Sequence, residues 1–315
     1  MPLAQKDLLG LRNISIEDIQ EILDTADLMK YILSQNNKKT PHLQGKSIVN
    51  LFYENSTRTR LSFELAGKYM SASTANVAAP SSSVAKGESL IDTGKTIERM
   101  GADIIVIRHP MSGASQLLAE NVQASVINAG DGMNEHPTQA LLDMFTIKEE
   151  KSTMDGLKVT ILGDILHSRV ARSNIWGLGK MGAQIRVAGP STLMAPDLEK
   201  MGVQVFYNVE DAIEDADVVI VLRLQKERQQ SGLLPSLREY TEIYGLNRER
   251  LKRARKDVLV MHPGPINRGI EITSDIADGL HSHIDVQVTN GVAIRMALLY
   301  LMTRGRRDQD VLMHP

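Results

Sequence analysis

The 315-residue sequence predicts an α/β fold of two domains, each a mainly parallel sheet flanked by helices. Short apolar runs alternate with amphipathic helical stretches from one end of the chain to the other. The runs are continuous rather than strictly alternating, which is typical of strands covered by helices on both sheet faces. At roughly 150 residues per domain, the length is sufficient for two hydrophobic cores.

The first half of the chain predicts an opening helix followed by a repeated strand–helix pattern. The opening helix is expected over about 15–34, because Ser15 and Asp18 resemble a capping box and apolar residues then recur at helical spacing. The strands expected in this half are 47–53, 74–79, 103–107 and 125–128. The helices expected between and after them are 56–70, 87–100, 112–120 and 137–150.

The second half continues the same pattern. Its expected strands are 158–162, 185–188, 203–206, 217–222 and 258–261. Its expected helices are 168–181, 208–215, 247–254 and a long, apolar C-terminal helix over about 285–304. The polar stretch 225–247 has no clear periodicity, so we expect a long loop there, and loops of that size are often functional.

A domain boundary is expected near residue 151, where a polar stretch follows the helix 137–150 and precedes a new strand. The first domain is then 1–150, with the C-terminal segment of about 285–315 packing back onto it, and the second is 151–284.

Composition excludes several classes of protein. The formal net charge of −2 argues against a general nucleic-acid binder or a polybasic membrane-surface protein. The chain has no cysteine, which removes disulfides, thiolate zinc sites and a cysteine nucleophile. The first residues lack a basic-then-apolar pattern and no apolar run is long enough to span a membrane, so we expect a cytoplasmic protein.

Two motifs suggest a bound cofactor or metal and are rejected. The glycine pattern from Gly177 to Gly182 falls at the end of a helical stretch, whereas a dinucleotide-binding loop opens one. His281, His283 and Asp285 are better explained as exposed loop residues than as metal ligands. We therefore expect neither a cofactor nor a metal.

The segment Ser56-Thr57-Arg58-Thr59-Arg60 predicts an anion site. It follows an apolar strand and opens a helix, whose first N–H groups and dipole favour a negative charge. Three hydroxyls and two guanidiniums supply more donors than helix capping uses, and the arginine fork suits phosphate oxygens. A serine N-cap followed by solvated arginines is the ordinary alternative for such a sequence.

The same segment begins a resemblance that extends over nearly the whole chain. Phe52 to Glu64 closely resembles the carbamoyl-phosphate signature of the aspartate/ornithine carbamoyltransferases. Further matching motifs follow in order: Lys86-Gly87-Glu88-Ser89, Arg108-His109-Pro110, His136-Pro137-Thr138-Gln139, Gly163-Asp164 with Arg169, Arg223-Leu224-Gln225, and His262-Pro263-Gly264-Pro265.

The resemblance implies transfer of a carbamoyl group from carbamoyl phosphate to L-aspartate, the committed step of de novo pyrimidine biosynthesis. Ornithine enzymes typically carry an H-C-L-P element where this chain has His262-Pro263-Gly264-Pro265. A substrate with two carboxylates also favours arginines, which Arg169 and Arg223 supply. The alternatives are a carbamoyltransferase acting on ornithine or another amino acid, and a catalytically silent trimeric scaffold.

The resemblance also assigns residues to carbamoyl phosphate. Ser56, Thr57, Arg58, Thr59 and Arg108 would hold the phosphate, whereas Arg60 stays open between a ligand role and a structural one. His136 would donate to the carbamoyl oxygen and Gln139 would accept from the carbamoyl amine, although both also fit a plain capping box. Backbone groups of Gly264 and Pro265 would orient the carbamoyl and attacking amines.

A second set of implied residues concerns aspartate and the assembly. Arg169, Arg223 and Gln225 would bind aspartate. Ser82 and Lys86 would reach the site of a neighbouring subunit, with Ser81 and Ser83 as alternatives to Ser82. Lys86 would contact aspartate as well. The implied assembly is a homotrimer with shared active sites, alone or joined by a regulatory chain or a dihydroorotase, and Glu54, Arg169 and Arg228 would form ion pairs in a closed state.

Overall fold

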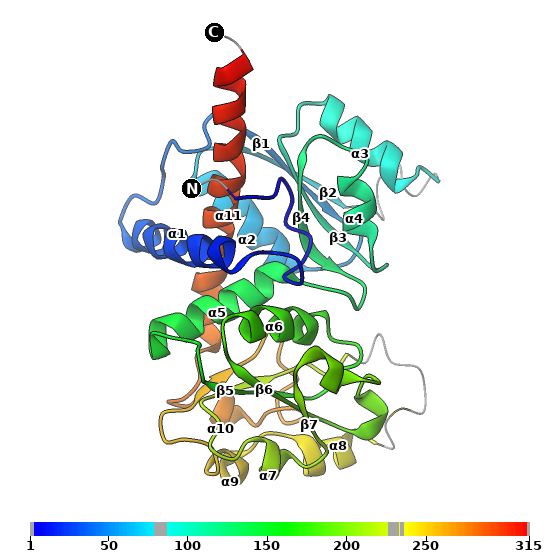
Figure 1. The fold of residues 1–315 in the computed structure, drawn as a ribbon, viewed down its shortest axis with the longest axis vertical. Helices are drawn as coiled ribbons and strands as arrows, with labels where there is room; N and C mark the ends of the chain where they lie inside the picture. The colour runs from blue at the N-terminus through cyan, green and yellow to red at the C-terminus, as the bar shows by residue number, and fades with distance from the viewer. Residues whose placement is uncertain (1–2, 79–86, 226–232, 234–235, 314–315) are drawn as a thin grey trace. The chain divides into compact units, whose positions relative to one another are not determined.

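The computed structural model describes residues 3–78, 87–225, 233 and 236–313, with side chains described as far as Arg304 (Figure 1). The chain forms two compact units, Met1–Leu141 with Thr289–Pro315, and Leu142–Val288. Each unit contains one sheet, and every strand pair in both sheets is parallel. The predicted α/β fold with two parallel sheets flanked by helices is confirmed.

The first unit contains a four-stranded sheet in the order β2-β1-β3-β4. Its strands are β1 (Ser47–Phe52), β2 (Ser73–Ala78), β3 (Ile104–His109) and β4 (Ser125–Asp131). The helices that belong to it are α1 (Ile16–Ser34), α2 (Thr57–Tyr69), α3 (Leu90–Arg99), α4 (Ala114–Ala119), the start of α5 (Pro137–Lys151) and most of α11 (Ile284–Met313). These strands and helices agree with the predicted ones to within a few residues at each end, except that α11 continues nine residues beyond its predicted end at about 304.

Helices cover both faces of this sheet. On one face, α3 and α4 pack on Leu51, Ile105 and Val126, which form one buried cluster with Ile97 and Leu118 of the two helices. On the other face, Gly67 of α2 lies close to Ile48 and Thr74. Burial on both faces explains why the strands read as continuous apolar runs.

The N-terminal segment extends the edge of the sheet beyond β4. The Leu8 N–H donates to Val126 O over 2.9 Å, and the Asn128 N–H donates to Leu8 O over 2.9 Å. Lys6 Nζ donates to Val122 O at 2.9 Å, just after the end of α4. The outer edge of β4 is therefore paired at its centre.

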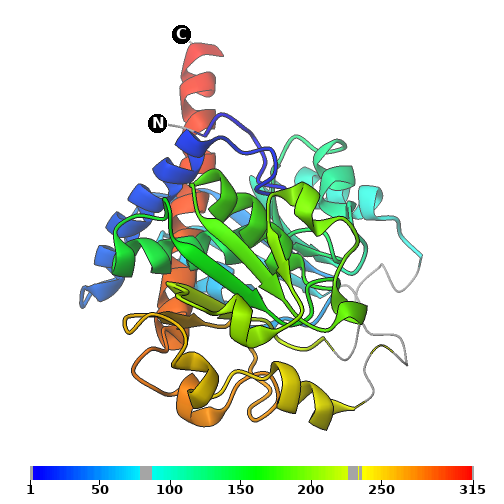
Figure 2. The same ribbon diagram turned by 60° about the horizontal axis from the view of Figure 1, so that its bottom comes forward.

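The second unit contains a five-stranded sheet in the order β7-β6-β5-β8-β9. Its strands are β5 (Lys158–Leu162), β6 (Gln184–Ala188), β7 (Gln204–Phe206), β8 (Val218–Val221) and β9 (Leu259–Met261). Its helices include α6 (Arg169–Lys180), α7 (Val209–Ala212), α8 (Leu237–Tyr244), α9 (Arg248–Leu251) and α10 (Ser274–Ala277). The views of Figures 1 and 2 place α6 on one face of this sheet and α7, α9 and α10 on the other.

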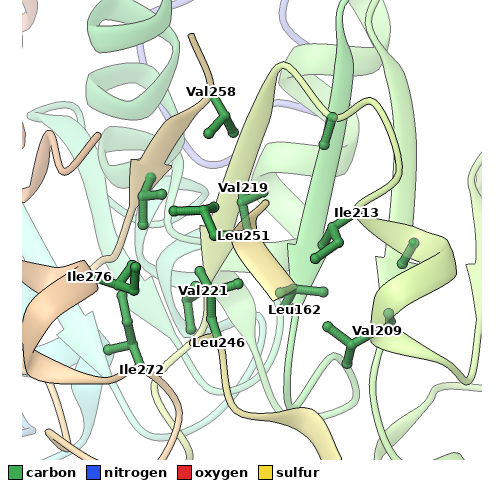
Figure 3. Close-up of a cluster of buried hydrophobic side chains, with 14 of the residues drawn as sticks. Leu162, Val209, Ile213, Val219, Val221, Leu246, Leu251, Val258, Ile272 and Ile276 are labelled. Carbon is green, nitrogen blue, oxygen red and sulfur yellow. The ribbon is translucent and has the colours of Figure 1, made fainter. Parts of the chain in front are cut away.

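The buried residues of the core on the face of α7, α9 and α10 are aliphatic, with the partly buried Phe206 and Tyr244 packed against them. Leu162, Val219 and Val221 point from the sheet toward Ile213, Leu251 and Ile276, as Figure 3 shows.

The predicted loop over 225–247 is wrong in part, because α8 occupies Leu237–Tyr244. Ser236 caps this helix, and its Oγ accepts from the Glu239 N–H at 3.0 Å. Only Tyr240 of its eight residues is buried, so no apolar periodicity marked the helix.

Among the described helices, none combines the length and the apolar character needed to cross a membrane.

Candidate active site

The first candidate site lies where the strand order of the first sheet reverses. The chain passes from β1 to β2 on one side of it, and then crosses to β3 on the other side of β1. The switch point therefore lies between β1 and β3. Ligands of open parallel sheets bind at the carboxyl ends of the strands at such a point. Phe52 at the end of β1 is the register partner of Arg108 in β3. The segment that follows β1 and leads to Ser56 therefore begins beside Arg108.

Helix α2 starts at this point with an open N-terminus. Its N-cap residue, Ser56, has extended backbone angles, but its hydroxyl makes no capping hydrogen bond. The N-cap side chains of six other helices do accept such a bond: Ser15, Ser89, Ser168, Asn208, Ser236 and Asn247. No acidic residue lies in the first turn of α2. The helix therefore presents unused N–H groups and a hydroxyl to an anion.

The side chains of the segment from Ser56 to Arg60 differ in their exposure to solvent. Thr57, Arg58 and Arg60 are exposed, Ser56 is partly buried, and Thr59 is buried at 7% exposure. Because an α-helix turns 100° per residue, Arg58 and Arg60 point to opposite sides of α2. Helix geometry thus places Arg58 and Arg60 on different faces of the helix mouth.

Arg108 is held at the end of β3 by hydrogen bonds to Glu54 and Ala129. Its Nε donates to Glu54 Oε2 at 3.1 Å, and its Nη1 donates to Ala129 O at 3.3 Å. The Tyr53 N–H donates to the Arg108 carbonyl at 2.8 Å, which ties the end of β1 to the same residue. A bound anion would compete with Glu54 for this guanidinium.

His136 and Gln139 lie at the start of α5, after β4. The Gln139 N–H and the Ala140 N–H donate to His136 O at 3.0 and 3.3 Å. Both side chains are buried, with exposures of 4% for His136 and 8% for Gln139. His136 Nδ1 lies 3.5 Å from Thr138 Oγ1, which also receives a bond of 3.5 Å from Arg295 Nη2.

The segment before His136 is fixed by two buried carboxylates. Asp131 accepts from Gly113 N at 2.7 Å and from Asn128 Nδ2 at 2.7 Å. Glu135 accepts from the Leu11 N–H at 2.7 Å. Sequence reasoning missed both residues; the polar run at the end of an otherwise buried strand was the available signal.

The second unit repeats the arrangement with different groups. Its strand order reverses between β5 and β8, and Arg169 follows β5 whereas Arg223 follows β8. The Leu222 N–H donates to Leu162 O at 2.8 Å, so the two strand ends are adjacent. The switch point of the second sheet therefore carries the two predicted aspartate-binding arginines.

The segment that leads from β5 to Arg169 is ordered by a buried pair. Asp164 Oδ1 lies 2.8 Å from His167 Nδ1 and accepts from the His167 N–H at 3.1 Å. Tyr240 lies nearby, since its hydroxyl is 3.0 Å from the position that a Cβ on Gly163 would occupy. Burial, with the charges of Glu271 and Asp164, raises the pKa of Tyr240 well above its usual range, so it remains a neutral phenol.

The turn after β9 holds Gly264 and Pro265. Gly264 has a φ of +61°, which favours glycine, and the peptide bond to Pro265 is cis. The Gly264 N–H donates to His262 Nδ1 at 2.8 Å. The turn follows the strand next to β8, at the same edge of the sheet as Arg223.

Comparison with known proteins identifies the family. The profile of the aspartate/ornithine carbamoyltransferase carbamoyl-P binding domain matches residues 6–149, and that of the Asp/Orn binding domain matches residues 155–302. The chain belongs to the aspartate/ornithine carbamoyltransferase family.

Relatives within this carbamoyltransferase family cover the chain almost end to end. The aspartate carbamoyltransferase catalytic subunit of Ruminiclostridium cellulolyticum is 68% identical over 304 residues, 96% of this chain and 97% of that protein. The protein of the same name from Acetivibrio thermocellus is 68% identical over 311 residues, 99% of this chain and 100% of that protein.

Solved structures agree with the carbamoyltransferase fold. The aspartate transcarbamoylase of Trypanosoma cruzi, in complex with carbamoyl aspartate and phosphate, has a TM-score of 0.86 at 28% identity, covering 95% of this chain and 98% of that one. The ornithine carbamoyltransferase of Pyrococcus furiosus has a TM-score of 0.85 at 30% identity, covering 96% and 98%. The fold alone therefore does not separate the two branches of the family.

The structure places most of the predicted site residues at strand ends. In the first unit, Ser56–Thr59, Arg108, His136 and Gln139 follow or end β1, β3 and β4, whose carboxyl ends share one edge. In the second unit, Arg169, Arg223, Gln225, Gly264 and Pro265 follow β5, β8 and β9. Ser82, Lys86 and Arg228 lie outside the described residues. Among the side chains that are described, no group of three or more His, Asp or Glu residues could hold a metal ion.

Proposed function

We propose that this chain transfers the carbamoyl group of carbamoyl phosphate to the amine of L-aspartate, giving N-carbamoyl-L-aspartate and phosphate. This reaction is the committed step of de novo pyrimidine biosynthesis. The observation that carries the proposal is the 68% identity, over 96% of the chain, to a relative named aspartate carbamoyltransferase catalytic subunit. The proposed reaction needs no cofactor, because the amine attacks the carbonyl directly and no covalent intermediate forms.

The first step of the proposal is capture of the phosphate by α2. Its open N-terminus, with Ser56 uncommitted as a cap and Arg58 exposed, favours a dianion. Thr57 and Thr59 add hydroxyl donors, and Arg108 would exchange Glu54 for the phosphate. The same donors would stabilise the phosphate as it leaves.

The second step is polarisation of the carbamoyl carbonyl. His136 would donate to the carbonyl oxygen, on which negative charge develops as the amine attacks. Gln139 would accept from the carbamoyl amine and hold the group in line. Fixing the geometry in advance is effective because Asp131 and Glu135 already order the chain before His136.

The third step is recognition of aspartate by the second unit. Arg169 and Arg223 stand at the switch point of its sheet and present planar forks suited to the two carboxylates. Gln225 would add a polar contact beside Arg223. Backbone carbonyls of the Gly264–Pro265 turn would orient the attacking amine and the carbamoyl amine.

We assign carbamoyl-phosphate binding to residues 1–150 with the C-terminal helix and aspartate binding to residues 151–284. The two matched profiles support this division, since they carry those descriptions for residues 6–149 and 155–302. The second profile runs into α11, whereas chain contacts group Thr289–Pro315 with the first unit. That grouping supports the return of the last helix to the carbamoyl-phosphate domain.

The proposed assembly is a cytoplasmic homotrimer in which Ser82 and Lys86 complete the site of the next subunit and Lys86 also contacts aspartate. The relatives are named catalytic subunits, which is consistent with a further regulatory chain or dihydroorotase as a partner. Measuring the native mass of the purified, active particle tests both parts of this proposal.

An acceptor assay tests the function directly. The purified chain is incubated with carbamoyl phosphate and either L-aspartate or L-ornithine, and the carbamoylated product is identified by mass spectrometry. N-carbamoyl-L-aspartate as the main product supports the proposal. Citrulline formed from ornithine would instead indicate an ornithine carbamoyltransferase. If neither amino acid gave a product, the chain would be a catalytically silent scaffold.

Complementation tests the shared site. Lys86→Ala chains and Arg58→Ala chains are each expected to be nearly inactive, because each lacks one half of every site. Mixing and reassembling them should restore partial turnover, since some sites then receive an intact Arg58 and an intact Lys86. Reassembled mixtures with no more activity than the parents would contradict sharing.

A further inference from the structure

A buried histidine–glutamate pair, His262 and Glu271, makes hydrogen bonds to the turn after β9. His262 Nδ1 accepts from the Gly264 N–H at 2.8 Å, and His262 Nε2 lies 3.2 Å from Glu271 Oε1. Glu271 Oε1 also accepts from the Asn267 N–H at 2.6 Å. Both side chains are fully buried. Two amides of the turn, those of Gly264 and Asn267, are thus fixed by one pair of side chains.

The contacts determine which nitrogen of His262 carries the proton. A backbone N–H can only donate, so Nδ1 must be an unprotonated acceptor. Nε2 must then carry hydrogen and donate to the Glu271 carboxylate. The glutamate therefore selects the form of the histidine that can hold Gly264.

Stability alone does not explain this pair. Glu271 Oε2 is buried, and within the described part of the chain it has no hydrogen-bond partner. A buried carboxylate with one unsatisfied oxygen lowers stability relative to apolar side chains of the same size. A constraint other than the free energy of unfolding accounts better for its presence beside the turn.

A chain of buried hydrogen bonds links the pair to α6. The His262 N–H donates to Gln287 Oε1 at 3.0 Å, and Gln287 Nε2 donates to Asp143 Oδ1 at 2.7 Å. Asp143 Oδ2 accepts from Asn174 Nδ2 at 2.8 Å, and Asn174 lies in α6. Helix α6 begins at Arg169, so the chain connects the Gly264–Pro265 turn with the helix of a proposed aspartate ligand.

We infer that His262 and Glu271 are positioning residues for carbamoyl transfer, which hold the Gly264–Pro265 turn in register with α6 through Gln287, Asp143 and Asn174. The inference rests on the proposed function, because only in that reaction do the carbonyls of this turn orient the reacting amines. A shift of the turn misaligns the amine with the carbonyl carbon, and small misplacements have large effects on rate.

Steady-state kinetics of the full-length protein test the inference. His262→Ala and Glu271→Ala are each expected to lower kcat by about tenfold or more. The loss of one buried hydrogen bond, if it raises the activation barrier, lowers the rate by roughly a factor of ten. The KM for carbamoyl phosphate should stay within about twofold, because the phosphate is held by the other unit. Glu271→Gln should retain kcat within about threefold, because its amide oxygen still accepts from Asn267 N and His262 Nε2.

Two polar variants cover the case in which the alanine variants do not fold. His262→Asn keeps an acceptor near the Nδ1 position for Gly264, whereas His262→Gln keeps a donor near the Nε2 position for Glu271. His262→Asn should therefore lose less kcat than His262→Gln. Thr160→Val is the matched control, because it removes the buried 2.8 Å bond from Thr160 Oγ1 to Ala212 O. It should lower the Tm and leave kcat within about twofold.

Three outcomes would overturn the inference. They are wild-type kcat in both alanine variants, a Glu271→Gln variant as impaired as Glu271→Ala, or an equal loss of kcat in Thr160→Val. Failure of the proposed function is distinguishable, because the wild-type chain would then form no N-carbamoyl-L-aspartate.

Discussion

The two sheets carry candidate anion sites at equivalent positions but with different chemical groups. Each has its candidate site at the point where the strand order reverses, between β1 and β3 in one unit and between β5 and β8 in the other. The helix after the first switch strand, α2, has an N-cap serine that makes no side-chain capping bond. The helix after the second, α6, is closed by Ser168, whose hydroxyl accepts from the Ala171 N–H at 3.1 Å.

This difference matches the two proposed ligands. A phosphate dianion has oxygens on every side and suits a ring of main-chain N–H groups at an open helix end. A dicarboxylate has two planar groups and suits guanidinium forks on a rigid support. The closed cap of α6 then supports Arg169, whereas the open mouth of α2 is itself part of the proposed site.

The largest expected effect comes from removing the phosphate clamp. Arg58→Ala should lower kcat/KM by about a hundredfold or more, because Arg58 would stabilise charge on the departing phosphate. Arg60→Ala is the matched control, since Arg60 is also exposed but points to the other side of α2. Steady-state rates of both variants provide the test. Equal losses of kcat/KM in the two variants would contradict a specific role for Arg58 in phosphate binding.

A smaller effect is expected at the second switch point. Arg223→Lys keeps the charge but loses the fork, so the KM for aspartate should rise by about tenfold while that for carbamoyl phosphate stays nearly constant. Arg172→Lys, one turn into α6, provides the control. A rise in the carbamoyl phosphate KM instead would contradict the division of ligands between the two sheets.

The two N-cap serines test the comparison itself. Ser168→Ala should lower the free energy of unfolding by about 1 kcal/mol, because it removes a working cap. Ser56→Ala should change stability less and should raise the KM for carbamoyl phosphate, because its hydroxyl caps nothing. Urea unfolding and initial rates of both variants are needed. If Ser56→Ala proves the more destabilising, α2 is an ordinary capped helix.

The smallest effect concerns acid sensitivity beside the first site. Partial burial lowers the pKa of His109 below its ordinary value of 6.5, although the negative charges of Glu54 and Asp131 oppose this. The neutral ring therefore stabilises the folded state above pH 6.5, and this contribution is lost as the pH falls through the folded-state pKa. His109→Asn keeps the acceptor for Met111 N and should flatten the decline of unfolding free energy between about pH 7 and 5. An unchanged slope would argue against this titration.

The regular elements were predictable because their signals are local. All nine strands were expected from continuous apolar runs, which follow from burial on both faces of each sheet. Helices α8 and α10 were not expected. The helix α10 is only four residues long, and in α8 Leu237 and Ile243 are exposed and Tyr240 alone is buried. Ser236 and Glu239, at the spacing of a capping box, were the available indication.

The candidate site was predictable only where its residues are close in sequence. The Ser56 segment and the His136 segment are short motifs at helix starts. The Arg108–Glu54 pair and the link from Asp143 to Gln287 join residues 54 and 144 positions apart. Such pairings depend on strand order, which apolar patterns do not specify.

The paired edge of β4 has a consequence for how the protein can be handled. An uncovered strand edge offers unpaired N–H and C=O groups to any other chain. Leu8 occupies this edge, and Leu11 reaches the carboxylate of Glu135 next to His136. Shortening the chain by its first dozen residues would thus both expose a surface for aggregation and loosen the proposed catalytic histidine.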